Sequence, residues 1–274
     1  MGKWAKRSFG QETFEKIGII FGGTVVEHIE KEIVGSFDKV VSKKEKVYHA
    51  YILERGGKAY PILFNVYGAP AVMDLVAYLH DGGCRNLLFI GYAYGGFKQN
   101  LQVGSVFVPD KIYHFDGIYH GVRLDRKFTS PDEQLKKRLE EVLTKNKIEY
   151  TKGANISVPS VTFQLPHANE EYEKIGPATV EMESAACLSR AQDLGVRAVS
   201  ILIISDNRVS SIEDDQKRII SNDTKIKVAK TLIESLNSFK LQPLKTKKEF
   251  NIDEHLANII HDPEDTTNIY RKGE

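Results

Sequence analysis

Short runs of consecutive apolar residues alternate along this chain with segments of helical periodicity. The clearest runs are Ile17 to Phe21, Asn86 to Gly91 and the β-branched stretch Arg197 to Ser205. Continuous apolar runs of this length are typical of strands buried on both faces, as in parallel sheets covered by helices. The alternation therefore predicts an α/β fold, a single-domain three-layer sandwich with a central mixed, largely parallel sheet flanked by helices.

Turn and capping residues predict the elements between these runs. Arg55-Gly56-Gly57-Lys58 separates two strand-like segments, 47–53 and 60–66, and so indicates a hairpin. Pro70 stands near the first position of a helix that Gly82-Gly83 ends. Further strands are expected at Ser105 to Pro109, Lys111 to Phe115 and Asn155 to Phe163. Further helices are expected after a capping box at Ser130 and Glu133, with Pro131 at the first helical position, and from about Glu181 to Leu194.

Charge and composition exclude several classes of protein. Lys and Arg number 38 against 37 Asp and Glu, a net charge of +1, so no general attraction to nucleic acid or to a membrane surface is expected. The hydrophobic fraction of 41% is ordinary for a soluble globular chain. There is no apolar run of the length that a transmembrane helix needs, and the charged N-terminus does not resemble a signal peptide. A cytoplasmic location is the default expectation.

Metal and cofactor signals are missing from the sequence. Cys84 and Cys187 stand far apart in apolar segments, which predicts two buried thiols. The histidines are scattered, and no Cys-His spacing resembles a zinc site. The glycines between Gly91 and Gly96 do not have the spacing of a dinucleotide fingerprint, which argues against a dehydrogenase. We therefore expect no metal and no cofactor.

The chain divides into a core and a tail. Periodicity fades from about Leu241, where charged residues take over. We expect one domain over residues 12–240 and a charged C-terminal appendage over residues 241–274.

Two acidic features stand where ligands commonly bind. Glu181 and Glu183 flank Met182 at the start of a predicted helix, where carboxylates are also favoured simply by the helix dipole. Asp206 follows the strongest predicted strand. Because open α/β sheets bind ligands at the carboxyl ends of their strands, Asp206 is a candidate site residue.

This combination resembles the nucleoside phosphorylase family, which includes purine nucleoside phosphorylases, uridine phosphorylases and methylthioadenosine nucleosidase. The Glu-Met-Glu helix start and the strand ending in Ser205-Asp206 carry the resemblance. Other segments agree in order: IGIIFGG from Ile17, Gly68-Ala69-Pro70, the strand ending at Gly91, Val103 to Val106 and Phe115 to Gly117. The resemblance spans about Lys16 to Leu236. It implies a small-molecule nucleoside ligand and a homo-oligomer: a dimer, trimer or hexamer.

The resemblance also implies roles for particular residues. Glu183 would bridge the 2′- and 3′-hydroxyls of ribose, and Met182 would pack against the sugar. Phe163 would stack on the base, with Glu181 and Asp206 also on the base side. Asp206 would protonate N7 of a purine, so partial burial should raise its pKa. No Arg follows Phe163 where uridine-cleaving members have one, which favours a purine.

The expected phosphate cradle is altered. The resemblance places one arginine near Val26, a second at Phe89 and a serine at Tyr92. The nucleosidase branch lacks both arginines because its nucleophile is water, and it orients that water with a glutamate close to Glu27. Glu27 could equally be a solvated helix residue.

The predicted nucleophile pocket contains Gly22, Gly23, Gly91 and Tyr92, and it takes either phosphate or water. An anion site could be restored by Arg208, or by Lys43, Lys44 or Lys46 of a neighbouring subunit. The sequence thus predicts an enzyme that cleaves an N-glycosidic bond. A catalytically silent nucleoside-binding protein on the same fold is the alternative.

Overall fold

The structure is a computed structural model that describes residues 2–96, 100–119, 126–160, 166–209, 215–242, 244 and 252–253, with the backbone alone at 166–169. Its helices are α1 (Lys3–Phe9), α2 (Glu27–Val34), α3 (Ala69–Asp81), α4 (Glu133–Lys145), α5 (Pro166–Ile175), α6 (Ser184–Asp193) and α7 (Asp215–Glu234), followed by a 3-10 turn at Leu236–Phe239. Its strands are β1 (Ile17–Gly22), β2 (Lys39–Glu45), β3 (His49–Arg55), β4 (Lys58–Val66), β5 (Asn86–Tyr94), β6 (Val106–His114), β7 (Phe128–Thr129), β8 (Tyr150–Ser157), β9 (Thr179–Glu181) and β10 (Arg197–Asp206).

The strands form one mixed sheet in the order β10-β6-β8-β9-β5-β1-β4-β3-β2, with β7 paired to β6. The central strands β4, β1, β5 and β10 are parallel, whereas the predicted β3–β4 hairpin and β2 extend the sheet in antiparallel fashion. Strand β10 also pairs with β5, so that β5, β9, β8, β6 and β10 close into a ring. Strand β8 is also parallel to β6 and to β9. The predicted α/β class with a mixed sheet is confirmed.

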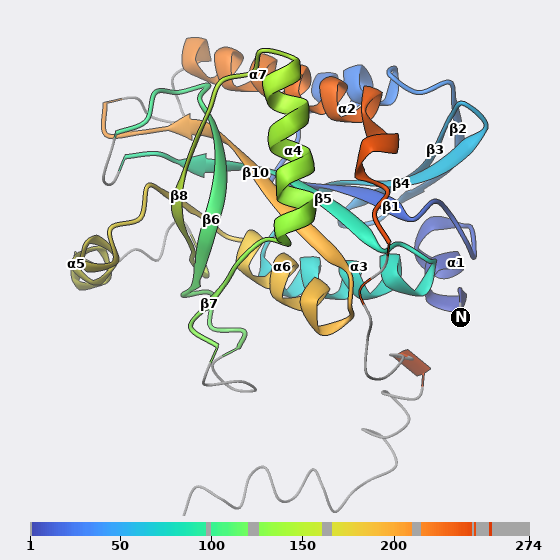
Figure 1. Ribbon diagram of the computed structural model, residues 1–274, viewed down its shortest axis with the longest axis horizontal. Helices are drawn as coiled ribbons and strands as arrows, with labels where there is room; N and C mark the ends of the chain where they lie inside the picture. The colour runs from blue at the N-terminus through green and yellow to red at the C-terminus, as the bar shows by residue number, and fades with distance from the viewer. Residues whose placement is uncertain are drawn as a thin grey trace, which may run out of the picture.

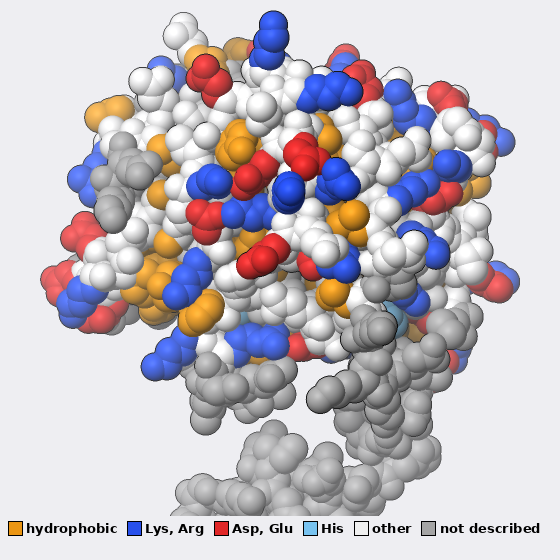
Figure 2. All heavy atoms as spheres, in the orientation of Figure 1, with side chains coloured by type: hydrophobic (Ala, Val, Ile, Leu, Met, Phe, Trp, Pro, Cys, Tyr) orange, Lys and Arg blue, Asp and Glu red, His pale blue; other side chains and the backbone are white. Residues whose placement is uncertain are grey.

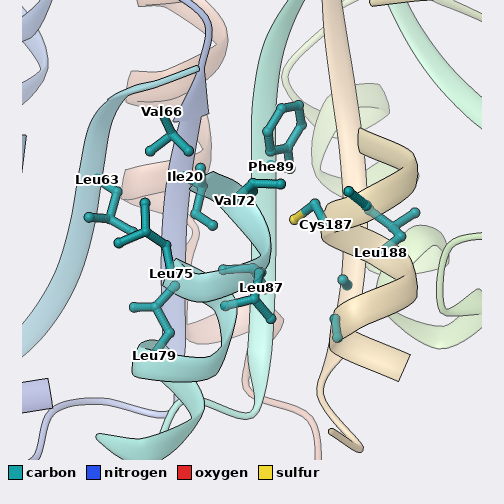
Figure 3. Close-up of a cluster of buried hydrophobic side chains, with 14 of the residues drawn as sticks. Ile20, Leu63, Val66, Val72, Leu75, Leu79, Leu87, Phe89, Cys187 and Leu188 are labelled. Atoms are coloured by element: carbon teal, nitrogen blue, oxygen red, sulfur yellow. The ribbon is translucent and has the colours of Figure 1, made fainter. Parts of the chain in front are cut away.

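Helices cover both faces of the sheet, as Figure 1 shows. One buried cluster joins the sheet to α1, α3 and α6 through residues such as Val72, Leu75 and Leu188 (Figure 3). The other joins it to α2, α4 and α7 through residues such as Ile29 and Leu139. Both cysteines are buried, as predicted. The three-layer arrangement leaves the carboxyl ends of β1, β5 and β10 together at one edge.

The charges on the surface and the hydropathy of the helices can be compared with the composition of the chain. On the face that Figure 2 shows, basic and acidic side chains are interspersed. None of the helices in the described part of the chain has both the length and the apolar character needed to cross a membrane.

Three predicted boundaries are wrong for identifiable reasons. Helix α4 is capped by Asp132, whose carboxylate accepts a hydrogen bond from Leu135 N, so Pro131 precedes the cap instead of occupying the first turn. The two strands predicted around Asp110 are one strand, β6, with an irregularity in its pairing between Pro109 and Lys111. Glu181 ends strand β9, and the helix begins three residues later at Ser184. The Asp132 and Glu181 errors arose where a carboxylate outside the helix accepts hydrogen bonds from the backbone N–H groups at its start.

Candidate functional site

A cavity of about 1010 Å³ opens at the carboxyl ends of β1, β5 and β10. A volume of this order accommodates a nucleoside-sized ligand. Six of the predicted site residues line it: Gly23, Tyr92, Glu181, Met182, Glu183 and Asp206. Phe163 lies outside the described residues. The fold thus brings the Glu-Met-Glu segment and the β10 terminus to one cavity, as the ligand rule for open sheets predicts.

Glu183 is held at the junction of β9 and α6. It is the N-cap residue of α6, it is 5% exposed, and its Oε1 accepts a 2.7 Å hydrogen bond from the backbone N–H of Gly68. Burial raises the pKa of Glu183, and the neighbouring carboxylate of Glu181 raises it further. The Gly68 hydrogen bond and the positive charge of Lys225 oppose that rise in pKa. Glu183 is therefore a fixed carboxylate whose charge depends on nearby donors and cations.

Glu181 does not have the free carboxylate that the predicted base contact requires. Its oxygens accept five hydrogen bonds, from Asn155 Nδ2, Ser157 Oγ, Ser184 Oγ and the backbone N–H groups of Glu183 and Ser184. The two backbone donors are orphan groups of the first turn of α6, and a carboxylate is the preferred partner there. Glu181 thus supports the cavity wall by fixing the backbone that carries Glu183.

We expect Glu181→Gln to destabilise the protein. The amide NH₂ of glutamine would face donors that now share a carboxylate, and the loss should reach about 3 kcal/mol or more of unfolding free energy. Denaturant unfolding monitored by circular dichroism measures this loss of unfolding free energy. The control is Glu173→Gln, an exposed glutamate on the same cavity that should unfold at the wild-type midpoint. Equal midpoints for the two variants would contradict the supporting role.

Asp206 reaches the cavity through an irregularity at the end of β10. The pairing of β10 with β5 shifts between Ile204, opposite Ala93, and Asp206, opposite Tyr94. Such bulges re-aim side chains, and here the extra residue is Ser205, whose hydroxyl donates a 2.5 Å hydrogen bond to Asp206 Oδ1. Burial raises the pKa of Asp206, while the Ser205 hydrogen bond lowers it. The predicted rise in the pKa of Asp206 is confirmed.

The end of the cavity predicted for the nucleophile has apolar and aromatic walls. Gly23 has a left-handed backbone with φ of 72°, which favours glycine, and Val26 and Tyr92 line the space beyond it. Gly22 and Gly91 do not line the cavity. A Cβ added to Gly22 would come within 2.2 Å of the buried ring of Phe89, so the ring occupies the space next to this turn.

Glu27, predicted to orient a water molecule, is not placed to do so. It lies outside the cavity lining at the first turn of α2, its side chain is 81% exposed, and its Oε1 pairs with Lys31 Nζ at 2.7 Å. The cavity is lined instead by the preceding residue, Val26. The structure thus supports the alternative that Glu27 is a solvated helix residue.

Sequence reasoning missed the contribution of α7. Arg218, Ser221 and Asn222 line the cavity, and Lys225 is fully buried one turn further along. The helical periodicity of α7 could have revealed them. Val228, Ala229 and Leu232 form its buried face. Three or four residues before them on the same face stands Lys225, and one turn earlier stand Ser221 and Asn222. Polar residues at core positions of a helix indicate a site.

In the described part of the chain, no group of three or more His, Cys, Asp and Glu side chains is placed to hold a metal ion.

The fold and cavity define an α/β protein that presents two buried or half-buried carboxyl groups, Glu183 and Asp206, to one nucleoside-sized space. The chain belongs to the phosphorylase superfamily, whose family model matches residues 27–239. This family contains phosphorylases and nucleosidases that cleave N-glycosidic bonds.

Known proteins similar to this chain include both phosphorolytic and hydrolytic kinds. DeoD-type purine nucleoside phosphorylases from two strains of Clostridium perfringens are 28% identical over 160 residues, which is 57% of this chain and 67% of theirs. The Campylobacter jejuni 5′-methylthioadenosine/S-adenosyl homocysteine nucleosidase superposes with a TM-score of 0.69 at 17% identity, over 83% of this chain and 100% of its own. The futalosine hydrolase of Helicobacter pylori superposes with a TM-score of 0.67 at 17% identity, over 80% of this chain and 98% of its own. The two structural likenesses define the fold.

Proposed function

We propose that this protein hydrolyses the N-glycosidic bond of a purine-type nucleoside, with Asp206 as the general acid and Glu183 as the residue that holds the ribose. The observation that carries the proposal is the presence of both side chains on one cavity, with the pKa of Asp206 raised by burial. A carboxylic acid that stays protonated nearer neutral pH can donate a proton to a departing base.

The reaction requires three coordinated events. The bond between C1′ and the base nitrogen breaks, and its electron pair goes to the base. Asp206 delivers a proton to the base, which therefore leaves uncharged. Water adds to C1′ and releases a proton, giving free ribose and free base. Glu183, anchored by the Gly68 amide, fixes the sugar so that C1′ faces the nucleophile.

Water is favoured over phosphate by the side chains around the β1 turn and the end of β5. Val26 and Tyr92 line this end of the cavity, and Phe89 fills the space beside Gly22. None of these side chains offers the positive charge that a phosphate dianion requires when it leaves bulk water.

Phosphorolysis is the second candidate, because Arg208 and Arg218 line the same cavity. Each already has a partner: Arg208 Nε donates to the carbonyl of Gly96, and Arg218 Nη2 lies 2.8 Å from Asp215 Oδ1. Both arginines come after Asp206 in the sequence. In the sequence they are closer to Asp206, the proposed acid, than to the β1 turn, where the nucleophile is expected.

One assay distinguishes the candidates. The protein is incubated with a panel of purine nucleosides, with and without inorganic phosphate, and the sugar product is identified by mass spectrometry. We expect free ribose at a rate independent of phosphate. Ribose-1-phosphate formed only with phosphate would establish phosphorolysis instead. Saturable nucleoside binding without turnover would identify a silent binding protein.

A further inference from the structure

Lys225 is an unusual residue for the interior of this fold. It projects from α7 with none of its surface exposed, and its only hydrogen bond within the described residues is a 3.4 Å contact from Nζ to the carbonyl of Gly22. Its ammonium also lies 3.6 Å from the centre of the Tyr92 ring. In the described part of the chain no carboxylate is within ion-pair distance of it, although Glu183 is near enough to interact with its charge.

These contacts compensate only part of the cost of burying a charge. An ammonium group has three donors, and burying it without a paired anion costs several kcal/mol. Burial accordingly lowers the pKa of Lys225 to about 7, and the charge of Glu183 only partly offsets that effect. The protonated side chain would therefore gain stability from an anion placed beside it.

Tyr92 is the contact between this ammonium and the cavity lining. Tyr92 lines the cavity, whereas Lys225, whose ammonium lies against the Tyr92 ring, does not. The Tyr92 hydroxyl donates a 2.6 Å hydrogen bond to Asn222 Oδ1, which holds the ring in place from the same helix that carries Lys225. We call this hydrogen-bonded pair, whose Tyr92 ring lies against the ammonium, the cover.

The space in front of this cover already has one feature that suits an anion. Helix α2 begins at Glu27, directly after the cavity-lining residues Thr24 and Val26. The amino end of a helix carries partial positive charge. An anion there would face both the helix end and, without the tyrosine ring, the ammonium of Lys225.

We propose that Lys225 is a masked anion-binding group and that Tyr92, fixed by Asn222, is the residue that keeps phosphate out of the nucleophile end of the cavity. Among the side chains that favour water over phosphate, Tyr92 is thus the one that keeps a cation from the anion. The link to the reaction rests on the proposed function, whereas the masked anion site does not.

The test measures binding of inorganic phosphate by calorimetry, without nucleoside, so that its outcome is independent of catalysis. Tyr92→Ser should bind phosphate roughly tenfold or more tightly than the wild type, because charge-assisted hydrogen bonds to the uncovered ammonium become available. Adding Lys225→Met to Tyr92→Ser should remove the gain. The matched control is Tyr94→Ser, which enlarges the same cavity from the same strand and should show no gain.

Asn222→Ala provides a second variant in case Tyr92→Ser does not fold. It frees the tyrosine hydroxyl while keeping the ring, and it should give a smaller gain in phosphate binding. The proposal is overturned if neither variant gains phosphate binding, or if the gain persists without Lys225. If phosphate binds as expected but no variant cleaves a nucleoside, the proposed function fails and the masked site stands. If wild type releases free ribose and Tyr92→Ser releases ribose-1-phosphate, both are supported.

Discussion

Asp206→Ala should lower kcat for purine nucleoside cleavage by roughly 10²–10⁴-fold, the range typical for removal of a general acid. The departing base would leave as an anion, because the proton that neutralises it would be missing. Nucleoside affinity should change far less, since the ribose contacts remain. Single-turnover kinetics and equilibrium binding measure the two quantities separately.

The pH dependence supplies a sharper check on the same residue. Asp206 acts in its protonated form, so activity should fall as pH rises through its raised pKa. Ser205→Ala removes a hydrogen bond that lowers this pKa, and should move the alkaline fall in activity to higher pH. An Asp206→Ala protein with wild-type kcat, or a pH profile unmoved by Ser205→Ala, would rule out the assigned acid.

The sequence predicts the central sheet and the placement of Asp206 for the same physical reason. Strands buried on both faces must be apolar throughout, so the run from Arg197 to Ser205 stands out, and a charged residue directly after it must lie at the edge of the sheet. The hairpin and the glycine-ended helix α3 were predictable because their turns need particular backbone conformations. These patterns involve residues close together in the sequence, so they can be recognised without knowing the three-dimensional structure.

The features of the fold and site that the sequence did not predict depend on contacts between distant segments. Two of the five hydrogen bonds of Glu181 come from Asn155 and Ser157 in β8, which are distant in the sequence, so the segment around Glu181 does not by itself separate a supporting role from a ligand contact. The ring closure of β5 with β10 is equally a long-range pairing. Lys225 could have been noticed as a charge on the buried face of α7, but its proximity to Gly22 and Tyr92 required the fold.

At a pH above the raised pKa of Glu183, where its carboxyl group is ionised, Glu183→Gln should lower kcat/KM for a ribonucleoside by roughly 10²-fold. Hydrogen bonds to a charged acceptor contribute about 1.5–3 kcal/mol each and those to a neutral one about 0.5–1.5. The geometry explains why an isosteric change has this effect. The Gly68 N–H requires an acceptor at the Oε1 position, so the amide oxygen of glutamine must occupy it. The amide nitrogen then stands in place of the second oxygen, where it donates instead of accepting.

The comparison that isolates this contact uses a ribonucleoside and its 2′-deoxy counterpart. The wild type should prefer the ribonucleoside because the carboxylate of Glu183 accepts a hydrogen bond from the 2′-hydroxyl. In Glu183→Gln the ratio of kcat/KM for the ribonucleoside to kcat/KM for the 2′-deoxynucleoside should fall toward one. Most of this change should come from a lower kcat/KM for the ribonucleoside. Glu173→Gln, which changes an exposed glutamate on the same cavity, should keep the wild-type preference. A Glu183→Gln enzyme that still discriminates between the two sugars would show that another residue holds the ribose.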